Sequence, residues 1–173
     1  NRQRRWIMKK FLAFVFVGLL VCSGAWAANV TITATASQVL SVATGSTTWS
    51  VTLDNTGTAL VSPVDSLTVK SSKHAYTVTF SSSDAGQLKM TSGSDSYYIP
   101  YLIKVDTTGW VSGVSTNNLS DYIQLTTAKI IVFNARTPVA GKSFPIGFKI
   151  NEYADYYENG LYSATLTIGI SAN

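Results

Sequence analysis

The stretch NEYADYYENG holds the densest group of side chains in the sequence that could do chemistry. It alternates three carboxylates with three tyrosines: Glu152, Tyr153, Asp155, Tyr156, Tyr157 and Glu158. Carboxylates can bind calcium or accept hydrogen bonds from sugar hydroxyls, and tyrosine rings offer stacking faces, although the spacing matches no EF-hand loop. The plainer interpretation is a solvated loop between two late strands. Both interpretations stay open at the level of sequence.

The other chemistry-bearing residues are few and scattered. Trp110, in TTGWVSG, is predicted to be an exposed loop aromatic available to a ligand, whereas Trp49 shares the phase of Val51 and Leu53 and is predicted to be core. His74 is the only histidine, and we expect it to be structural or in a turn. The one cysteine lies in the leader described next, so zinc and disulfides are not expected. We therefore predict no catalytic residue, no metal and no cofactor.

The N-terminal segment has the features of an export signal. MKKFLAFVFVGLLV followed by CSGAWA combines a positive head, a short apolar middle and an A-x-A end, which predicts a signal peptide cleaved after residue 27. The apolar middle is shorter than the ~20 residues of a spanning helix. Met8 is the expected natural start, and Arg4-Arg5 suggests a twin-arginine signal as an alternative. We expect leader residues 1–27 and one exported domain, residues 28–173.

The charge balance argues against a nucleic-acid partner. Residues 1–27 hold five of the 13 Lys and Arg residues and none of the nine Asp and Glu residues, so eight basic residues face nine acidic ones in the exported part. Nucleic-acid binding needs clustered basic side chains, and these eight are spread along the sequence.

Short segments of alternating apolar and polar residues dominate the exported part. They are separated by Ser, Thr, Gly, Asn and Asp: residues 49–53, 67–69, 76–80, 88–90, 99–105, 129–133, 144–150 and 162–170. This period of two predicts strands with one buried face, and the spacing of the turns predicts an all-β antiparallel sandwich. We expect hairpins at SSKHAY and at SGSDS, and an edge or a bulge at Pro100, which lacks a backbone donor.

The first exported residues form an unusually regular strand pattern. In NVTITATAS, residues 29–37, apolar Val30, Ile32, Ala34 and Ala36 alternate with polar residues. The segment NVTITATASQVLSV resembles the N-terminal donor segment of chaperone-usher fimbrial subunits of the cysteine-free alpha, or colonisation-factor, type. ENGLYSATLTIGISAN resembles their last strand, and SYYIPYLIKVD is more loosely similar to the central strand of pilins and of spore-coat-U-like secreted domains. Gly160-Leu161-Tyr162 also fits the tyrosine corner of immunoglobulin-like sandwiches.

This resemblance implies an immunoglobulin-like sandwich that lacks its final strand. The N-terminal segment of a neighbouring subunit, with Val30, Ile32, Ala34 and Ala36 inward, would fill a groove whose apolar face is Ala164, Leu166, Ile168 and Ile170. The implied partners are copies of this chain or other pilus subunits, a periplasmic chaperone and an outer-membrane usher. The implied location is the periplasm in transit and then the cell surface.

Two alternatives to a structural fibre subunit stay open. In the first, NVTITATAS is the first strand of an ordinary complete secreted sandwich. In the second, the domain is an adhesin-like binding module that holds host or surface glycans with Trp110, Tyr153, Tyr156 and Tyr157. An enzyme using Glu152 or Asp155 is a distant third.

Overall fold

The computed structural model describes residues 33–173. The predicted leader, and Val30 and Ile32 of the predicted donor strand, lie outside the described residues. The chain divides into two units, with a boundary between Ala36 and Ser37. Of the first unit, residues 33–36 are exposed and belong to no strand.

The second unit is almost entirely β. Its elements, in chain order, are β1 (Leu40–Thr44), β2 (Leu60–Ser71), β3 (Tyr76–Ser82), β4 (Gln87–Ser92), β5 (Asp95–Pro100), β6 (Leu102–Val105), the 3-10 helix η1 (Thr108–Gly113), β7 (Val114–Asn117), β8 (Lys129–Phe133), β9 (Lys142–Ile150) and β10 (Leu166–Ala172). Within residues 33–173, no helix has the length and apolar character needed to cross a membrane.

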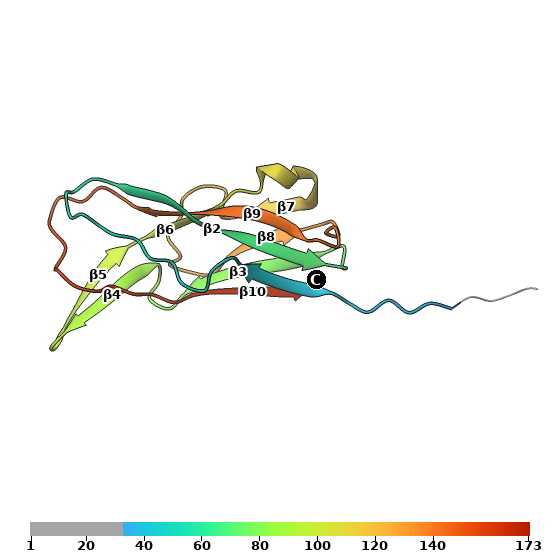
Figure 1. Ribbon diagram of the computed structural model, residues 1–173, viewed down its shortest axis with the longest axis horizontal. Helices are drawn as coiled ribbons and strands as arrows, with labels where there is room; N and C mark the ends of the chain where they lie inside the picture. The colour runs from blue at the N-terminus through green and yellow to red at the C-terminus, as the bar shows by residue number, and fades with distance from the viewer. Residues whose placement is uncertain (1–32) are drawn as a thin grey trace, which may run out of the picture. The chain divides into compact units, whose positions relative to one another are not determined.

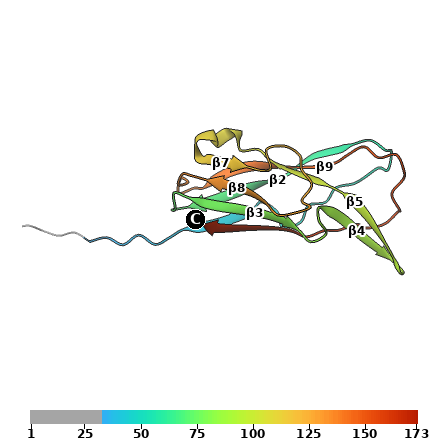
Figure 2. The same cartoon turned by 180° about the vertical axis from the view of Figure 1, so that it is seen from behind.

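Two four-stranded antiparallel sheets form the body of this unit, and the predicted all-β fold is confirmed. One sheet has the order β1-β2-β9-β6 and the other the order β10-β3-β8-β7, while β4 and β5 pair as a separate hairpin. Figure 1 shows β2 and β9 running above β3 and β10, and Figure 2 shows the same layers from behind. β1 and β10 are therefore edge strands of different sheets, and they contact each other.

The core lies between the two sheets because the strands alternate as their sequences predict. Tyr76, Val78 and Phe80 of β3 are buried, and the residues between them are only partly buried. Aromatic rings join the layers: Phe133 of β8 lies 5.6 Å from Phe144 of β9, measured between ring centroids. Packing of large rings across the sheets supplies much of the apolar burial that stabilises a domain of this size.

The predicted hairpin at SSKHAY is wrong. β2 pairs with β1 and β9, whereas β3 pairs with β10 and β8, so residues 72–75 carry the chain from one sheet to the other. The polar residues of this stretch do reverse the chain direction, but a reversal can join strands of two packed sheets as easily as neighbouring strands of one sheet. His74 lies in this crossing and is exposed.

The hairpin predicted at SGSDS is confirmed as the turn between β4 and β5. The segment 99–105 is split, because β5 pairs with β4 while β6 pairs with β9. Pro100 ends β5, which has a single neighbour, so this proline lies on an edge as its missing N–H requires.

Candidate functional site

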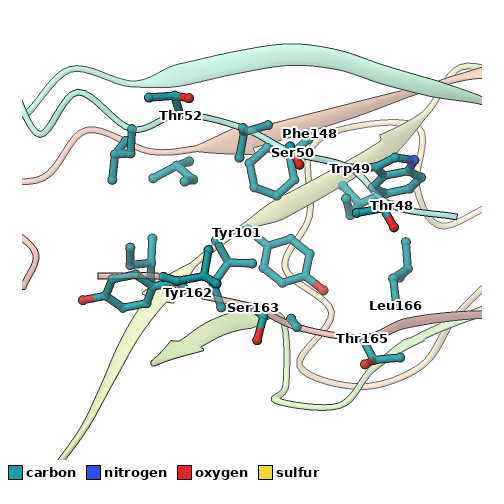
Figure 3. Close-up of a pocket in the computed structure, with 18 of the residues that line it drawn as sticks. Thr48, Trp49, Ser50, Thr52, Tyr101, Phe148, Tyr162, Ser163, Thr165 and Leu166 are labelled. Carbon is teal, nitrogen blue, oxygen red and sulfur yellow. The ribbon is translucent and has the colours of Figure 1, made fainter. Parts of the chain in front are cut away.

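A long groove opens between two walls of the second unit. Its volume is about 990 Å³, and it runs from Val42 and Ile168 to Asn55 and Leu161. One wall is the unpaired segment, which we define as residues 46–55, and the other is the chain from Tyr157 to Ile168. Figure 3 shows the two walls facing each other, with the side chain of Leu166 pointing towards Trp49 and that of Thr165 on the other side of its chain segment.

The floor of the groove is apolar and rigidly packed. Tyr101 and Phe148 stack with their ring centroids 5.5 Å apart, and Ile103 and Ile150 also line the floor. The Tyr101 hydroxyl donates a hydrogen bond of 2.9 Å to Ser82 Oγ. Burial raises the pKa of Tyr101, which favours the neutral hydroxyl that donates this bond. A floor of this kind can receive apolar side chains but offers little to a charged ligand.

The wall that leads into β10 has backbone groups turned towards the groove. Ser163 exchanges two backbone hydrogen bonds with Lys89, of 2.8 and 3.0 Å, and the Thr165 carbonyl accepts one from Ser83. Because neighbouring residues of a strand direct their N–H and C=O groups to opposite sides, those of Tyr162 and Ala164 face the groove. Within residues 33–173 neither has a backbone partner. This wall is an open strand edge.

The opposite wall keeps the predicted strand alternation without strand pairing. Trp49, Val51 and Leu53 are half-buried against the core, and Ser50 and Thr52 are exposed. None of the residues from Trp49 to Leu53 makes a backbone hydrogen bond with any other described residue. We predicted these residues as an ordinary core strand, and their place on the groove was missed because nothing in an alternating pattern says whether the strand has neighbours.

Asp65, at the irregularity in β2, fixes the start of this wall. Its carboxylate accepts hydrogen bonds from the backbone N–H groups of Gly45 at 3.0 Å and Ser46 at 2.8 Å, and from Trp49 Nε1 at 2.9 Å. Desolvation by burial would raise the pKa of Asp65, but the bonds from Trp49, Ser46, Ser66 and Gly45 outweigh it and lower that pKa. The charged carboxylate therefore anchors the chain where it leaves β1.

The far mouth of the groove carries the predicted tyrosine corner. Tyr162 Oη donates a hydrogen bond of 2.9 Å to the backbone carbonyl of Glu158, four residues earlier, which is the contact that defines this feature. Nearby, Asn55 donates to the Tyr157 carbonyl at 2.9 Å and accepts from the Tyr157 N–H at 3.1 Å. The two walls are thus tied together at this mouth by side-chain bonds and not by a strand.

The predicted acceptor face largely lines the groove. Ala164, Leu166 and Ile168 belong to its wall, whereas Ile170 packs half-buried against the core and does not line it. Of the predicted donor residues, Ala34 and Ala36 are exposed in the first unit, outside any strand, and Val30 and Ile32 lie outside the described residues.

The predicted ligand residues do not form one site. Trp110 is not an exposed loop aromatic: it is half-buried, with its ring 5.8 Å from that of Phe133 and 6.2 Å from that of Phe144. η1, which carries it, lies beside β7, whereas residues 151–160 lie at the other end of the sheets, near β4 and β5 (Figures 1 and 2). Tyr153 and Tyr157 pack on each other at 4.6 Å, and Tyr156 alone is largely exposed.

Residues 33–173 contain no group of three His, Cys, Asp or Glu side chains placed to hold a metal ion. Neither a known protein-family model nor a curated protein matches this sequence.

Proposed function

We propose that this protein is a non-catalytic structural subunit of a surface fibre, in which each subunit completes its fold with a strand from another copy. The observation that carries the proposal is the open groove between the unpaired segment and the wall from Tyr157 to Ile168. Both walls present backbone groups that have no partner among the described residues, and the floor between the walls is apolar. A strand placed there gains main-chain hydrogen bonds along its length and pockets for alternate side chains.

The order of the strands supports an incomplete immunoglobulin-like sandwich. In such sandwiches one sheet has the order A-B-E-D and the other contains C, F and G. Taking β1, β2, β3, β6, β9 and β10 as strands A to F reproduces the first order and places F beside C. The seventh strand, G, would lie beside β10, which is the side of the chain that faces the groove.

The N-terminal segment has a suitable length and side-chain pattern. Val30 to Ala36 spans seven residues with four alternating apolar positions, and the wall from Tyr162 to Ile168 also spans seven residues, in which four half-buried positions alternate with exposed ones. Each extends over about 20 Å as a strand. Burial of Val30 and Ile32 would contribute roughly 1.5–3 kcal/mol each, before the cost of ordering the segment is subtracted.

The same features call for protection before assembly. An open edge with an apolar floor would pair with other exposed strands and aggregate. A subunit of this kind therefore travels with a periplasmic chaperone that lends a strand, and it is handed on at an outer-membrane usher, as in the chaperone-usher fimbrial subunits that the two ends of the sequence resemble.

The test is a gel of the exported protein in SDS, unheated beside boiled. Strand-exchanged polymers resist SDS at room temperature, so we expect a ladder of multiples that collapses to one band on boiling. Deletion of residues 29–36 is expected to leave only the monomer. A single monomer band from the unaltered chain in both lanes, or a ladder that survives the deletion, would overturn the proposal.

A matched pair of substitutions distinguishes a loss of strand docking from a general failure to export the chain. Ile32→Asp places a charge on the face predicted to enter the groove and is expected to remove the ladder. Thr33→Asp places the same charge on the opposite face of the same segment and is expected to keep it. Equal loss in both variants would speak against an inserted strand.

A further inference from the structure

We propose that copies of this protein stack end to end, with a basic end of one copy seated on an acidic end of the next. This inference rests on the proposed strand exchange, in which a segment that is part of one chain docks non-covalently into the body of the next. It adds a second contact, made by the folded units themselves, and it sets their order along the fibre.

The basic end lies where β2 finishes and β9 begins. It consists of four side chains: Lys70, Lys73, Arg136 and Lys142. Three of them are exposed, and Lys142 is half-buried. Hydrogen bonds hold the loops that carry them together, since Thr137 donates its backbone N–H to the Ser71 carbonyl at 3.1 Å and Ser71 Oγ bonds to the Lys73 carbonyl at 3.1 Å.

The acidic end lies where β2 begins and β9 finishes. It carries four exposed acidic side chains, Asp54, Glu152, Asp155 and Glu158, and one half-buried basic side chain, Lys149 near the end of β9. The Tyr153 N–H donates to the Gly57 carbonyl at 3.2 Å, and Asn55 bonds to Tyr157, so two loops distant in sequence present these acids together. The last residues of β2 pair with β1 at the basic end, and its first residue, Leu60, pairs with Ile150 at the acidic end. The 12 residues of β2 therefore separate the basic end from the acidic end by about 37 Å.

The two ends carry opposite net charge, and no ion pair within the described residues neutralises either of them. No ion pair joins any of these side chains to another residue of the described chain. Each end also exposes an apolar side chain: Val139 is 99% exposed at the basic end, and Leu161 is 89% exposed at the acidic end. Complementary charge steers association and selects the partner surface, and the contact would cover these apolar groups.

The path of the chain gives the stack its direction. The second unit begins at the basic end, where Val39 donates its N–H to Ser72 Oγ at 2.9 Å and accepts from the Ser72 N–H at 2.9 Å. A strand that precedes Ser37 is therefore tethered there. β1 and β10 contact each other at the basic end of the groove, whereas at the acidic end the two walls are joined by side-chain bonds of Asn55 to Tyr157 and not by packed strands. A strand leaving one basic end enters the next copy at its acidic end.

Charge reversal tests the contact in the full exported chain. Lys73→Glu with Arg136→Glu, and separately Glu152→Lys with Asp155→Lys, are each expected to slow the appearance of the ladder about tenfold at low salt. The chain that carries all four changes has both ends reversed, and it is expected to assemble within about twofold of the unaltered rate. Lys104→Glu with Lys129→Glu changes the net charge equally away from both ends and is expected to leave the rate unchanged.

Cross-linking gives a second readout that does not depend on rate. Exported chains with Arg136→Cys are mixed during assembly with exported chains with Asp155→Cys and treated with a short bismaleimide; Cys22 lies in the predicted leader, so each exported chain is expected to carry one cysteine. We expect a cross-linked pair from this mixture and none when Lys104→Cys replaces Arg136→Cys.

The outcomes separate the two proposals. A ladder without the cross-link, a quadruple variant as slow as the doubles, or equal slowing by the control changes overturns the end-to-end contact and leaves strand exchange standing. Absence of a ladder from the unaltered chain overturns strand exchange and the stacking built on it.

Discussion

The indole N–H of Trp49 donates a hydrogen bond of 2.9 Å to the carboxylate of Asp65, which also receives the backbone N–H groups of Gly45 and Ser46. This one carboxylate fixes the point at which the chain leaves β1 and becomes the unpaired wall of the groove. The position of that wall therefore depends on the charged carboxylate of Asp65 and not on hydrogen bonds between paired strands.

Replacing Asp65 by Asn is expected to lower the free energy of unfolding by about 1–3 kcal/mol, because the amide accepts at only one atom and bonds to a charged acceptor are the stronger ones. Trp49→Phe removes only one of the donors to this carboxylate and is expected to lower the free energy of unfolding by less than Asp65→Asn does. The double variant should lower the free energy of unfolding, measured with urea, by less than the sum of the losses in the two single variants. Strict additivity would show that the two residues act independently.

Acid is expected to release the same anchor. The pKa of Asp65 is lower in the folded chain than its ordinary value of 3.8, so its contribution to stability is present above pH 4 and is lost as the pH falls through the folded pKa. Urea unfolding between pH 5 and pH 2 checks this. The unaltered chain should lose more stability over that interval than Asp65→Asn, whose side chain does not titrate.

Filling the groove is expected to block assembly without unfolding the subunit. Ala164 is half-buried on the groove, whereas Thr165 is exposed and its side chain lies on the other side of the segment from that of Leu166 (Figure 3), so Ala164→Phe and Thr165→Phe add similar bulk to opposite faces of one chain segment. The first should lose the SDS-resistant ladder and the second should keep it, with both retaining a cooperative thermal transition. A ladder from Ala164→Phe would argue that no strand enters here.

Tyr76 is expected to make the fold sensitive to alkali. Its hydroxyl is buried without a hydrogen-bond partner among the described residues, and burial raises its pKa to about 12. The unfolded chain loses the Tyr76 proton near pH 10, whereas the folded chain keeps it until about pH 12. The free energy of unfolding is therefore unaffected below pH 10, falls as the pH rises above 10, and has lost the whole contribution of the neutral hydroxyl once the pH passes 12. Tyr76→Phe should remove this component, measured by urea unfolding at pH 8 and pH 11.

At neutral pH, Tyr76→Phe can be compared with Tyr101→Phe, which also removes a buried hydroxyl. Tyr76→Phe is expected to be neutral or stabilising, because an unpartnered buried hydroxyl is removed. Tyr101→Phe deletes the bond to Ser82 and is expected to cost about 1 kcal/mol. Equal losses from the two variants would mean that the Tyr76 hydroxyl has a partner in solution.

Two glycines of η1 offer a matched test of how Trp110 packs. A Cβ on Gly113 would collide with the indole of Trp110, whereas a Cβ on Gly109 would meet nothing within 4 Å. Gly113→Ala is expected to displace the ring from Phe133 and Phe144 and to cost about 1–3 kcal/mol. Gly109→Ala should change stability by less than about 0.5 kcal/mol. Equal tolerance at both positions would place the indole outside the core.

Local patterns were sufficient to predict which residues point inward. The alternation at Tyr76, Val78 and Phe80 predicted a half-buried strand, because side chains of a strand alternate between its faces whatever the strand pairs with. For the same reason the SGSDS turn and the tyrosine corner at Tyr162 could be found from a few neighbouring residues. These features are decided by the geometry of a short stretch of chain.

The tertiary structure decided which strand pairs with which. Residues 72–75 cross between sheets, the alternating stretch from Trp49 to Leu53 pairs with no strand within residues 33–173, and Trp110 packs on rings from β8 and β9. Each of these depends on chain segments tens of residues away, and a period of two carries no information about them. The sequence alone determined a sandwich of alternating strands, and the groove arose only when the two sheets packed and left two edges unpaired, because strand pairing is a non-local choice.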